Sequence, residues 1–200
     1  MFYETAENAH GLAHDPFKAI VSPRPIGWIG SRAGDGSLNL APYSFFNAIS
    51  DKPKLVMFSS AGRKDSVRNI EESGEFTANF VSFDLKEAMN ATSAPAPHGI
   101  SEFALAGLTP VTGRIVAAPY VGEAYAALEC KVTQIFRPQA LDGSESENHV
   151  VIGQVVGIHI REEAIRDGRF DMAKARPVGR MGYMDYCESG EVFEMLRPKY

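Results

Sequence analysis

The chain is poor in cysteine and contains no Cys-x-x-Cys pair. Its two cysteines, Cys130 and Cys187, are too few for a disulfide-stabilised scaffold. The five histidines are spread along the sequence without the spacing of zinc ligands. Residues 128–132 alternate between apolar and polar, which predicts that Cys130 is a buried thiol on a strand. We therefore expect neither a disulfide framework nor a metal site.

Long apolar runs and an excess of basic residues are also missing. No run approaches the roughly 20 residues that cross a bilayer, and residues 1–7 lack the basic and apolar regions of a signal peptide. A cytoplasmic protein without a membrane segment is expected. The 20 Lys and Arg residues face 25 Asp and Glu, a net charge of −5. This balance disfavours nucleic acid as a partner, but it leaves room for a local basic pocket that binds a small anion.

What is present is an ordinary globular composition. Apolar residues make up 44% of the 200 residues and charged residues 22%, which argues against disorder, collagen and coiled coil. Glycine and proline are scattered along the chain, and no linker or internal repeat interrupts it. We therefore expect one domain over residues 1–200.

Strand patterns outnumber helix patterns. Strands are predicted at 26–31, 54–59, 75–82, 111–116, 127–136 and 150–161, with an extended segment at 38–50 that Pro42 interrupts. The turn signal at 33–37 pairs the first strand with this segment as a hairpin, and 141–148 is a polar hairpin connection. Because no regular βαβ alternation occurs, the sequence predicts a mainly β fold with inserted helices, best fitted by an antiparallel barrel.

Helices are expected in three places. The first spans 65–73, with Gly74 in the position of a C-terminal cap. The second spans 84–91, with Asp84 as its N-cap. One or two helical turns are predicted at 101–106, after a proline-rich loop at 94–99.

The common catalytic signatures are absent. The sequence has no Gly-x-Gly-x-x-Gly, no Walker loop, no Gly-x-Ser-x-Gly and no His-Glu-x-x-His. These absences count against a dinucleotide-binding Rossmann enzyme, a nucleotide triphosphatase, an α/β-hydrolase and a zinc protease.

The most informative segment is 59–66, which leaves a buried strand and enters a helix. A helix N-terminus offers unpaired N–H groups and a partial positive charge. The hydroxyls of Ser60 and Ser66, with the cations of Arg63 and Lys64, complete a phosphate-sized anion site. The alternative is a solvated loop in which Asp65 or Ser66 only caps the helix.

A second candidate segment is 39–47. Pro42 cannot donate to a ladder, so an irregular strand is expected there, with backbone groups free to contact a flat ligand. Tyr43, Phe45 and Phe46 offer aromatic surface; the alternative is core packing, which is the favoured interpretation for Phe45 and Phe46 taken individually. The polar residues Asn39 and Asn47 are unusual in a strand.

Two weaker signals lie in the C-terminal half. His159 is predicted on the strand face of Val151, Gly153, Val155 and Gly157, where glycines allow close approach of a ligand; a purely structural histidine is the alternative. Residues 180–186 combine a cation, a glycine and two tyrosines, and as a generic pattern they are a loop that packs on the core.

Taken together, these segments resemble the flavin reductase-like family. The resemblance runs in order from about residue 15 to 187, through the segments 22–31, 39–46, 63–70, 75–80, 101–108, 153–159 and 180–186. No single motif is diagnostic, but the ordered set is fairly specific. It is most similar to the branch with the reductase component of nitrilotriacetate monooxygenase and flavoredoxin-like proteins.

The resemblance implies an antiparallel split β-barrel that binds FMN near the interface of a homodimer. It places the phosphate at Ser60, Arg63, Lys64 and Ser66, and the isoalloxazine edge at Tyr43, Ser44, Phe45 and Asn47. The other cofactor-binding candidates are Asn39, His159, Arg180 and Tyr183. Tyr183 stands where many relatives carry a second glycine, a departure that weakens the assignment of its segment. No catalytic residue and no metal ligand is implied.

Four functions stay open at this point. The first is an NAD(P)H:FMN oxidoreductase, with hydride passing from NAD(P)H to the flavin and a monooxygenase as the partner that receives reduced FMN. The second is a non-enzymatic, flavoredoxin-like FMN carrier. The third is oxidation of a pyridoxamine-phosphate-like substrate, which needs a second anion site, and the fourth is a flavin-free binding module.

Overall fold

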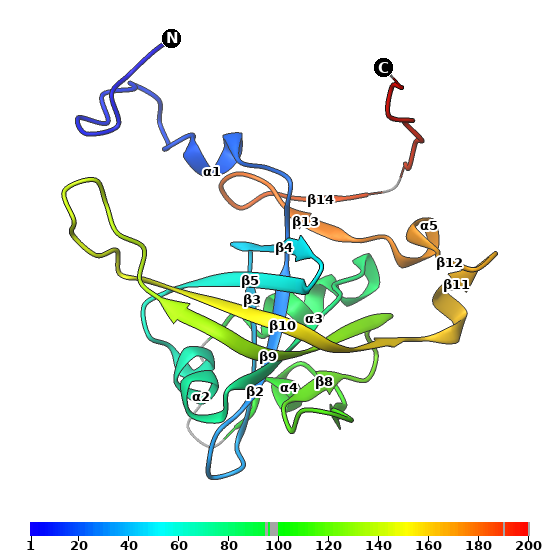
Figure 1. Cartoon of the computed structure of the whole chain (residues 1–200). Helices are drawn as coiled ribbons and strands as arrows, with labels where there is room; N and C mark the ends of the chain where they lie inside the picture. The colour runs from blue at the N-terminus through cyan, green and yellow to red at the C-terminus, as the bar shows by residue number, and fades with distance from the viewer. Residues whose placement is uncertain (95, 97–99, 190, 200) are drawn as a thin grey trace.

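The computed structural model describes residues 1–94, 96, 100–189 and 191–199. Its centre is a curled, antiparallel, seven-stranded sheet in the order β3-β2-β6-β9-β10-β5-β4 (Figure 1). The strands are β2 (Gly27–Arg32), β3 (Leu38–Tyr43), β4 (Phe46–Asp51), β5 (Lys54–Ala61), β6 (Glu75–Asn79), β9 (Ala126–Phe136) and β10 (Asn148–Ile160). The predicted mainly β, antiparallel fold class is confirmed.

The two edges of the sheet are joined by a very short link. Strands β3 and β4 lie at opposite ends of the strand order, yet only Ser44 and Phe45 separate them. The sheet therefore curls until its edges meet at this link. Gly27 of β2 makes the closure possible, since a Cβ there would lie 2.4 Å from the Phe46 ring on β4. The extended segment predicted at 38–50 is thus two strands rather than one.

Strand β3 runs through Pro42 without a register shift, so the expected irregularity is wrong. The strand is an edge of the sheet, and alternate N–H groups on an edge strand have no ladder partner. The Leu40 N–H points outward and donates to Glu102 at 3.0 Å. Pro42, two residues further, falls at the next outward position, where no ladder hydrogen bond is lost.

One face of the sheet packs on helix α2 (Asp65–Ser73). The buried cluster there includes Phe58, Ile70, Phe76 and Val151. Gly74 ends α2 in the left-handed conformation, with φ of 71°, and its N–H donates to the Ile70 carbonyl. The predicted helix and its cap are both confirmed.

Two short helices, α3 (Lys86–Ala91) and α4 (Glu102–Leu105), cover a second cluster built around Trp28, Phe103 and Met89. Ser101 caps α4, which is one turn long. Asp84 is not an N-cap: it lies within the 3₁₀ turn η1 (Phe83–Leu85), and Leu85 precedes α3. Its carboxylate instead faces Arg176 at 3.7 Å. The loop predicted at 94–99 lies mostly outside the described residues.

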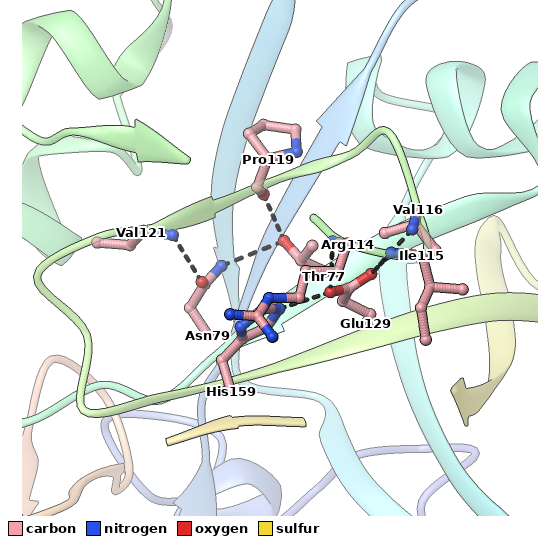
Figure 2. A network of polar contacts seen from close by, with 9 residues as sticks. All are labelled: Thr77, Asn79, Arg114, Ile115, Val116, Pro119, Val121, Glu129 and His159. Carbon is pink, nitrogen blue, oxygen red and sulfur yellow. Dashed lines mark hydrogen bonds and ion pairs between the residues drawn. The ribbon is translucent and has the colours of Figure 1, made fainter. Parts of the chain in front are cut away.

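Beside Trp28 and Leu40, the other face of the sheet carries buried polar side chains, which alternation in the sequence does not reveal. Thr77, Asn79 and Glu129 are at most 2% exposed. Asn79 accepts from the Val121 N–H at 2.8 Å, and Thr77 donates to the Pro119 carbonyl at 2.5 Å (Figure 2). These side chains hold the segment 113–121 over the sheet.

The strand predicted at 111–116 is therefore mostly wrong. Only β7 (Pro110–Thr112) forms, paired with β8 (Pro119–Val121). The backbone N–H groups of Arg114, Ile115 and Val116 donate to the Glu129 carboxylate instead of to a strand. Because these three consecutive N–H groups donate to a carboxylate, they are not available for the hydrogen bonds of a strand ladder.

The remaining elements lie near the chain ends. They are α1 (Phe17–Ile20), β1 (Arg24–Pro25), η2 (Glu162–Ala164), β11 (Ile165–Arg166), β12 (Arg169–Phe170), α5 (Met172–Ala175), β13 (Val178–Arg180) and β14 (Tyr186–Glu188). Strands β1, β13 and β14 form a small sheet beside α1 (Figure 1). Within the described residues, no helix is long and apolar enough to span a membrane.

Candidate functional site

A cavity of about 650 Å³ opens where β3, the start of α2 and the residues after α3 meet. Five of the residues predicted from the sequence line it: Asn39, Tyr43, Arg63, Lys64 and Ser66. They come from two segments more than 15 residues apart that the folded sheet brings together. The cavity is within the size range of small-molecule sites.

The N-terminus of α2 forms the basic wall of this cavity. Lys64 precedes the helix in extended conformation, and its own side chain makes no capping hydrogen bond to the first turn. Arg63 is paired with Glu71 at 2.6 Å, and Arg68 is paired with Asp65. Lys64 is exposed, and among the described residues it takes part in no ion pair. A helix N-terminus with an unpaired ammonium favours an anion.

The opposite wall is a chain of side-chain hydrogen bonds. Glu102, 9% exposed, accepts from Asn39 Nδ2 at 3.1 Å as well as from the Leu40 N–H. Asn39 Oδ1 in turn accepts from the Ser66 hydroxyl at 2.7 Å. Glu102 therefore fixes the Asn39 amide, and Asn39 fixes the rotamer of Ser66 in the first turn of α2.

Glu102→Gln is expected to lower the free energy of unfolding by about 1–2 kcal/mol. The glutamine amide nitrogen must face either the Leu40 N–H or the Asn39 amide, so a donor meets a donor. Urea unfolding measures the loss, and Glu72→Gln, an exposed residue on α2, is the matched control. Equal midpoints for the two variants would show that the Glu102 contacts contribute nothing.

Tyr43 lies between this cavity and the core. It is 8% exposed and packs on Phe58 with ring centroids 4.8 Å apart. Burial raises the pKa of its phenol, although the hydroxyls of Ser66 and Ser60 close to it act in the other direction. Most of the Tyr43 ring is therefore core, and only part of it faces the cavity.

Four predicted residues do not line the cavity. Ser60 is fully buried, and its hydroxyl donates to the Gly62 carbonyl at 2.9 Å, so it shapes the loop before α2. Ser44 and Phe45 form the link between β3 and β4, and the Phe45 carbonyl accepts from the Ser59 N–H. Asn47 is exposed on β4 and accepts from the next backbone N–H.

Arg180 and Tyr183 lie elsewhere. Arg180, on β13, donates to the Tyr183 carbonyl at 2.5 Å and lines a different cavity, which shares no residue with the first. Tyr183 has a positive φ of 55°, a conformation that favours glycine.

His159 belongs to the polar face of the sheet. A bulge places Val155 opposite Cys130 but Gly157 opposite Glu129, so the strand reverses its faces between them. The prediction that His159 shares a face with Val151 and Val155 is therefore wrong. Its Nε2 lies 2.5 Å from Glu129 Oε1 (Figure 2), and its ring stacks on Tyr120.

The Glu129 carboxylate is hydrogen-bonded to three backbone N–H groups and to His159. Burial acts to raise its pKa, but the hydrogen bonds from the Arg114 N–H, His159 and the N–H groups of Val116 and Ile115 outweigh burial and lower the pKa to about 2. The side chain is 1% exposed. A buried carboxylate that stays ionised near neutral pH and is fully bonded indicates a structural anchor for residues 114–116 rather than a proton donor.

Two features escaped the sequence analysis. Glu102 lies in the segment 101–108 used for the family resemblance, but nothing in that segment signals a partner 62 residues away. His149 lies opposite Ser60 in the β10–β5 ladder, and its buried Nδ1 has no hydrogen-bond partner among the residues that the structure describes. The sequence predicts a connection at 141–148 and a strand from 150, so His149 falls in neither and no local signal marks it.

Comparison with known proteins gives concordant matches. Residues 21–176 match the model of the flavin reductase like domain. A functionally uncharacterised protein of Aquifex aeolicus is 37% identical over 177 residues, which cover 85% of this chain and 86% of that protein.

Two solved structures are similar over nearly the whole chain. Nitrilotriacetate monooxygenase component B from Bacillus cereus superposes with a TM-score of 0.87 at 31% identity, covering 98% of each chain. Flavoredoxin of Desulfovibrio vulgaris superposes with a TM-score of 0.78 at 25% identity, covering 98% of this chain and 97% of its own. The seven strands of the sheet and the described lining of the cavity lie within residues 21–176, the part that the family model matches.

Proposed function

This chain belongs to the flavin reductase-like family, and on that premise we propose that it is an NAD(P)H-dependent FMN oxidoreductase. The observation that carries the proposal is the cavity at the start of α2, with the helix N-terminus and Lys64, which takes part in no ion pair among the described residues. When bound, flavin supplies the hydride-accepting chemistry. The chain's own residues bind it and orient it.

The donor set of the cavity suits the phosphate of FMN. Lys64 and the first-turn N–H groups of α2 offer positive charge and hydrogen-bond donors. Arg63 adds a guanidinium whose Nε is already held by Glu71. Across the cavity, Glu102 is an acceptor for hydroxyl groups of the ribityl chain. Ser60 stabilises the loop before α2 through its hydrogen bond to the Gly62 carbonyl. We also propose that the isoalloxazine edge lies next to Tyr43, Ser44, Phe45 and Asn47.

FMN is expected to bind more tightly than riboflavin, which lacks the phosphate. Charge-assisted hydrogen bonds contribute roughly 1.5–3 kcal/mol each, less at an exposed site. Titrations followed by flavin fluorescence compare the two ligands. Equal dissociation constants would remove the phosphate from the role proposed for the α2 N-terminus.

A spectroscopic experiment distinguishes the reductase from an FMN carrier. A reductase accelerates NADH or NADPH oxidation when FMN is added to the purified protein. A carrier retains its flavin and has a yellow spectrum without turnover of either nucleotide. If the protein binds no flavin, either as purified or after FMN is added, both functions are contradicted and a flavin-free binding module is favoured.

We further propose a homodimer. A cavity of about 450 Å³ on the sheet is lined by residues of β4, β5, β9 and β10. Val56, Leu128 and Ile158 are among its apolar members, and Ser50, Asp51 and Lys54 are its polar ones. Ile158 and Ile160 remain 50% and 44% exposed in the single chain, a degree of exposure that favours a protein interface. Light scattering tests it, and a monomer at micromolar concentration with flavin bound would contradict it.

A partner monooxygenase that receives reduced FMN is a separate proposal. Its support is the similarity to a protein named as a monooxygenase component. A colourless protein that reduces added FMN and releases it would agree with this role.

A further inference from the structure

An exposed apolar surface lies at one end of the small sheet formed by β1, β13 and β14 (Figure 1). Helix α1 packs there against the loop that joins β13 to β14, so closely that a Cβ on Gly182 would lie 2.4 Å from the Ala19 Cβ. We call this surface the α1–hairpin patch; it consists of Phe17, Ile20, Val21, Tyr183 and Met184, which are between 49% and 84% exposed. Large apolar side chains gathered on packed elements mark a protein interaction site.

Buried hydrogen bonds hold the two halves of this patch together. Arg24 is 8% exposed, and one of its guanidinium nitrogens donates to the carbonyls of Lys18 and Val21 at the end of α1. A second nitrogen donates to the Met181 carbonyl in the hairpin loop at 2.8 Å. In the same loop Tyr183 has a φ of 55°, which is costly for a bulky residue. A half-exposed ring gains little packing within one chain to offset that cost, which favours a contact outside the chain.

The C-terminal segment 191–199 is apolar and uncovered as well. It leaves the small sheet at the end of β14, away from the hairpin loop and the α1–hairpin patch (Figure 1). These residues form no helix or strand, and their apolar side chains are between 65% and 83% exposed: Val192, Phe193, Met195 and Leu196. Leaving so many large apolar side chains in water forgoes the free energy of burying them.

The patch and the segment are also complementary in charge. Lys18 on α1 is exposed and takes part in no ion pair among the described residues. Glu191 and Glu194 lie among the apolar residues of the segment, and both are exposed and outside the described ion pairs. Opposite charges beside two apolar surfaces favour their association.

We propose that the C-terminal segment of one copy covers the α1–hairpin patch of a second copy, and the reverse. Because the patch and the segment lie at opposite ends of one sheet, a two-fold rotation that places two copies antiparallel makes both contacts at once and closes the assembly as a dimer. Strand β1 of the small sheet also contacts β4, which lines the apolar cavity on the face used for the proposed homodimer. One partner copy can therefore contact both surfaces. The proposal rests on that homodimer and adds the exchanged segment to it.

Disulfide cross-linking tests the exchange in the full-length chain. The background is Cys187→Ser, which leaves only Cys130, a fully buried thiol whose pKa burial raises to about 12. Chains with Met184→Cys are co-expressed with chains with Phe193→Cys, oxidised with diamide and separated without reductant. We expect a covalent dimer that contains one chain of each kind, identified by mass spectrometry of the linked peptide.

Leu141 supplies the matched control, because it is a fully exposed apolar residue in the connection between β9 and β10. Leu141→Cys in place of Met184→Cys is expected to give little covalent dimer with Phe193→Cys. As a second measurement, Phe193→Asp is expected to raise the dimer dissociation constant about tenfold or more in sedimentation experiments. Leu141→Asp adds the same charge and should leave it unchanged. Since both positions are exposed, neither Asp variant should change the urea midpoint of the monomer.

The chain with both Met184→Cys and Phe193→Cys distinguishes exchange from back-folding. A disulfide within one chain would show that the segment covers its own patch, and it would overturn the exchange. So would covalent dimer no more abundant than in the Leu141→Cys control, with an unchanged dissociation constant in Phe193→Asp. A wild-type monomer contradicts the homodimer itself, whereas a dimer with neither effect contradicts only the exchange. None of these measurements needs flavin, so failure here is distinguishable from failure of the proposed function.

Discussion

Glu129→Ala is expected to lower the free energy of unfolding by about 3 kcal/mol or more, because it leaves buried donors unpaired. Three backbone N–H groups, of Arg114, Ile115 and Val116, lose their acceptor together with His159. Glu129→Gln keeps one acceptor oxygen, so its free energy of unfolding is expected to lie between those of the wild type and Glu129→Ala. Urea unfolding measures both, and hydrogen exchange at 114–116 reports the released amides.

The same carboxylate predicts a pH dependence. Its folded pKa of about 2 lies below the ordinary value of 4.5, so its stabilisation is fully present above pH 4.5 and is lost as the pH falls towards 2. A difference of this size corresponds to about 3 kcal/mol. Between pH 5 and pH 2, the free energy of unfolding of the wild type should therefore fall by more than that of Glu129→Gln. Parallel pH profiles for the two proteins would contradict the anchoring role.

Lys64→Ala is expected to raise the FMN dissociation constant about tenfold or more, which corresponds to ~1.4 kcal/mol. Lys64 is exposed and has no ion-pair partner among the described residues, so its charge is free for a phosphate. Riboflavin binding should change little. The apoprotein should keep its stability or gain slightly, since a cation before a helix opposes the helix dipole.

Flavin fluorescence quenching at moderate salt measures this effect. Lys131→Ala, which removes one exposed charge on β9 away from the cavity, controls for net charge. If FMN affinity is the same in the two variants, residues 59–66 are an ordinary solvated loop, the alternative that the sequence left open.

Local patterns were sufficient for several elements. Helix α2 and its Gly74 cap follow from spacing and from one glycine conformation, both properties of the chain itself. The basic segment 63–66 was found for the same reason: Arg63, Lys64 and Ser66 are consecutive or nearly so, and a helix N-terminus needs no distant partner to attract an anion.

Distant pairings escaped the sequence analysis. Nothing near Glu102 indicates that its carboxylate will complete the hydrogen bonds of an edge strand. The β10 bulge was equally invisible, and it moved His159 to the other face. A one-residue register change reverses every side chain beyond it, so alternation read from the sequence holds only up to the bulge.

The amino-acid sequence by itself determined the mainly β class, the helix after Lys64 and the cluster of cations there, because each depends on neighbours within about four residues. Tertiary structure decided which polar residues are buried. Thr77, Asn79 and Glu129 alternate with apolar residues as a solvent-facing row does, yet the segment 113–121 covers them. Within this segment the Glu129 carboxylate accepts from the N–H groups of residues 114–116, which lie outside any strand. Buried backbone groups must find such partners wherever the fold supplies them.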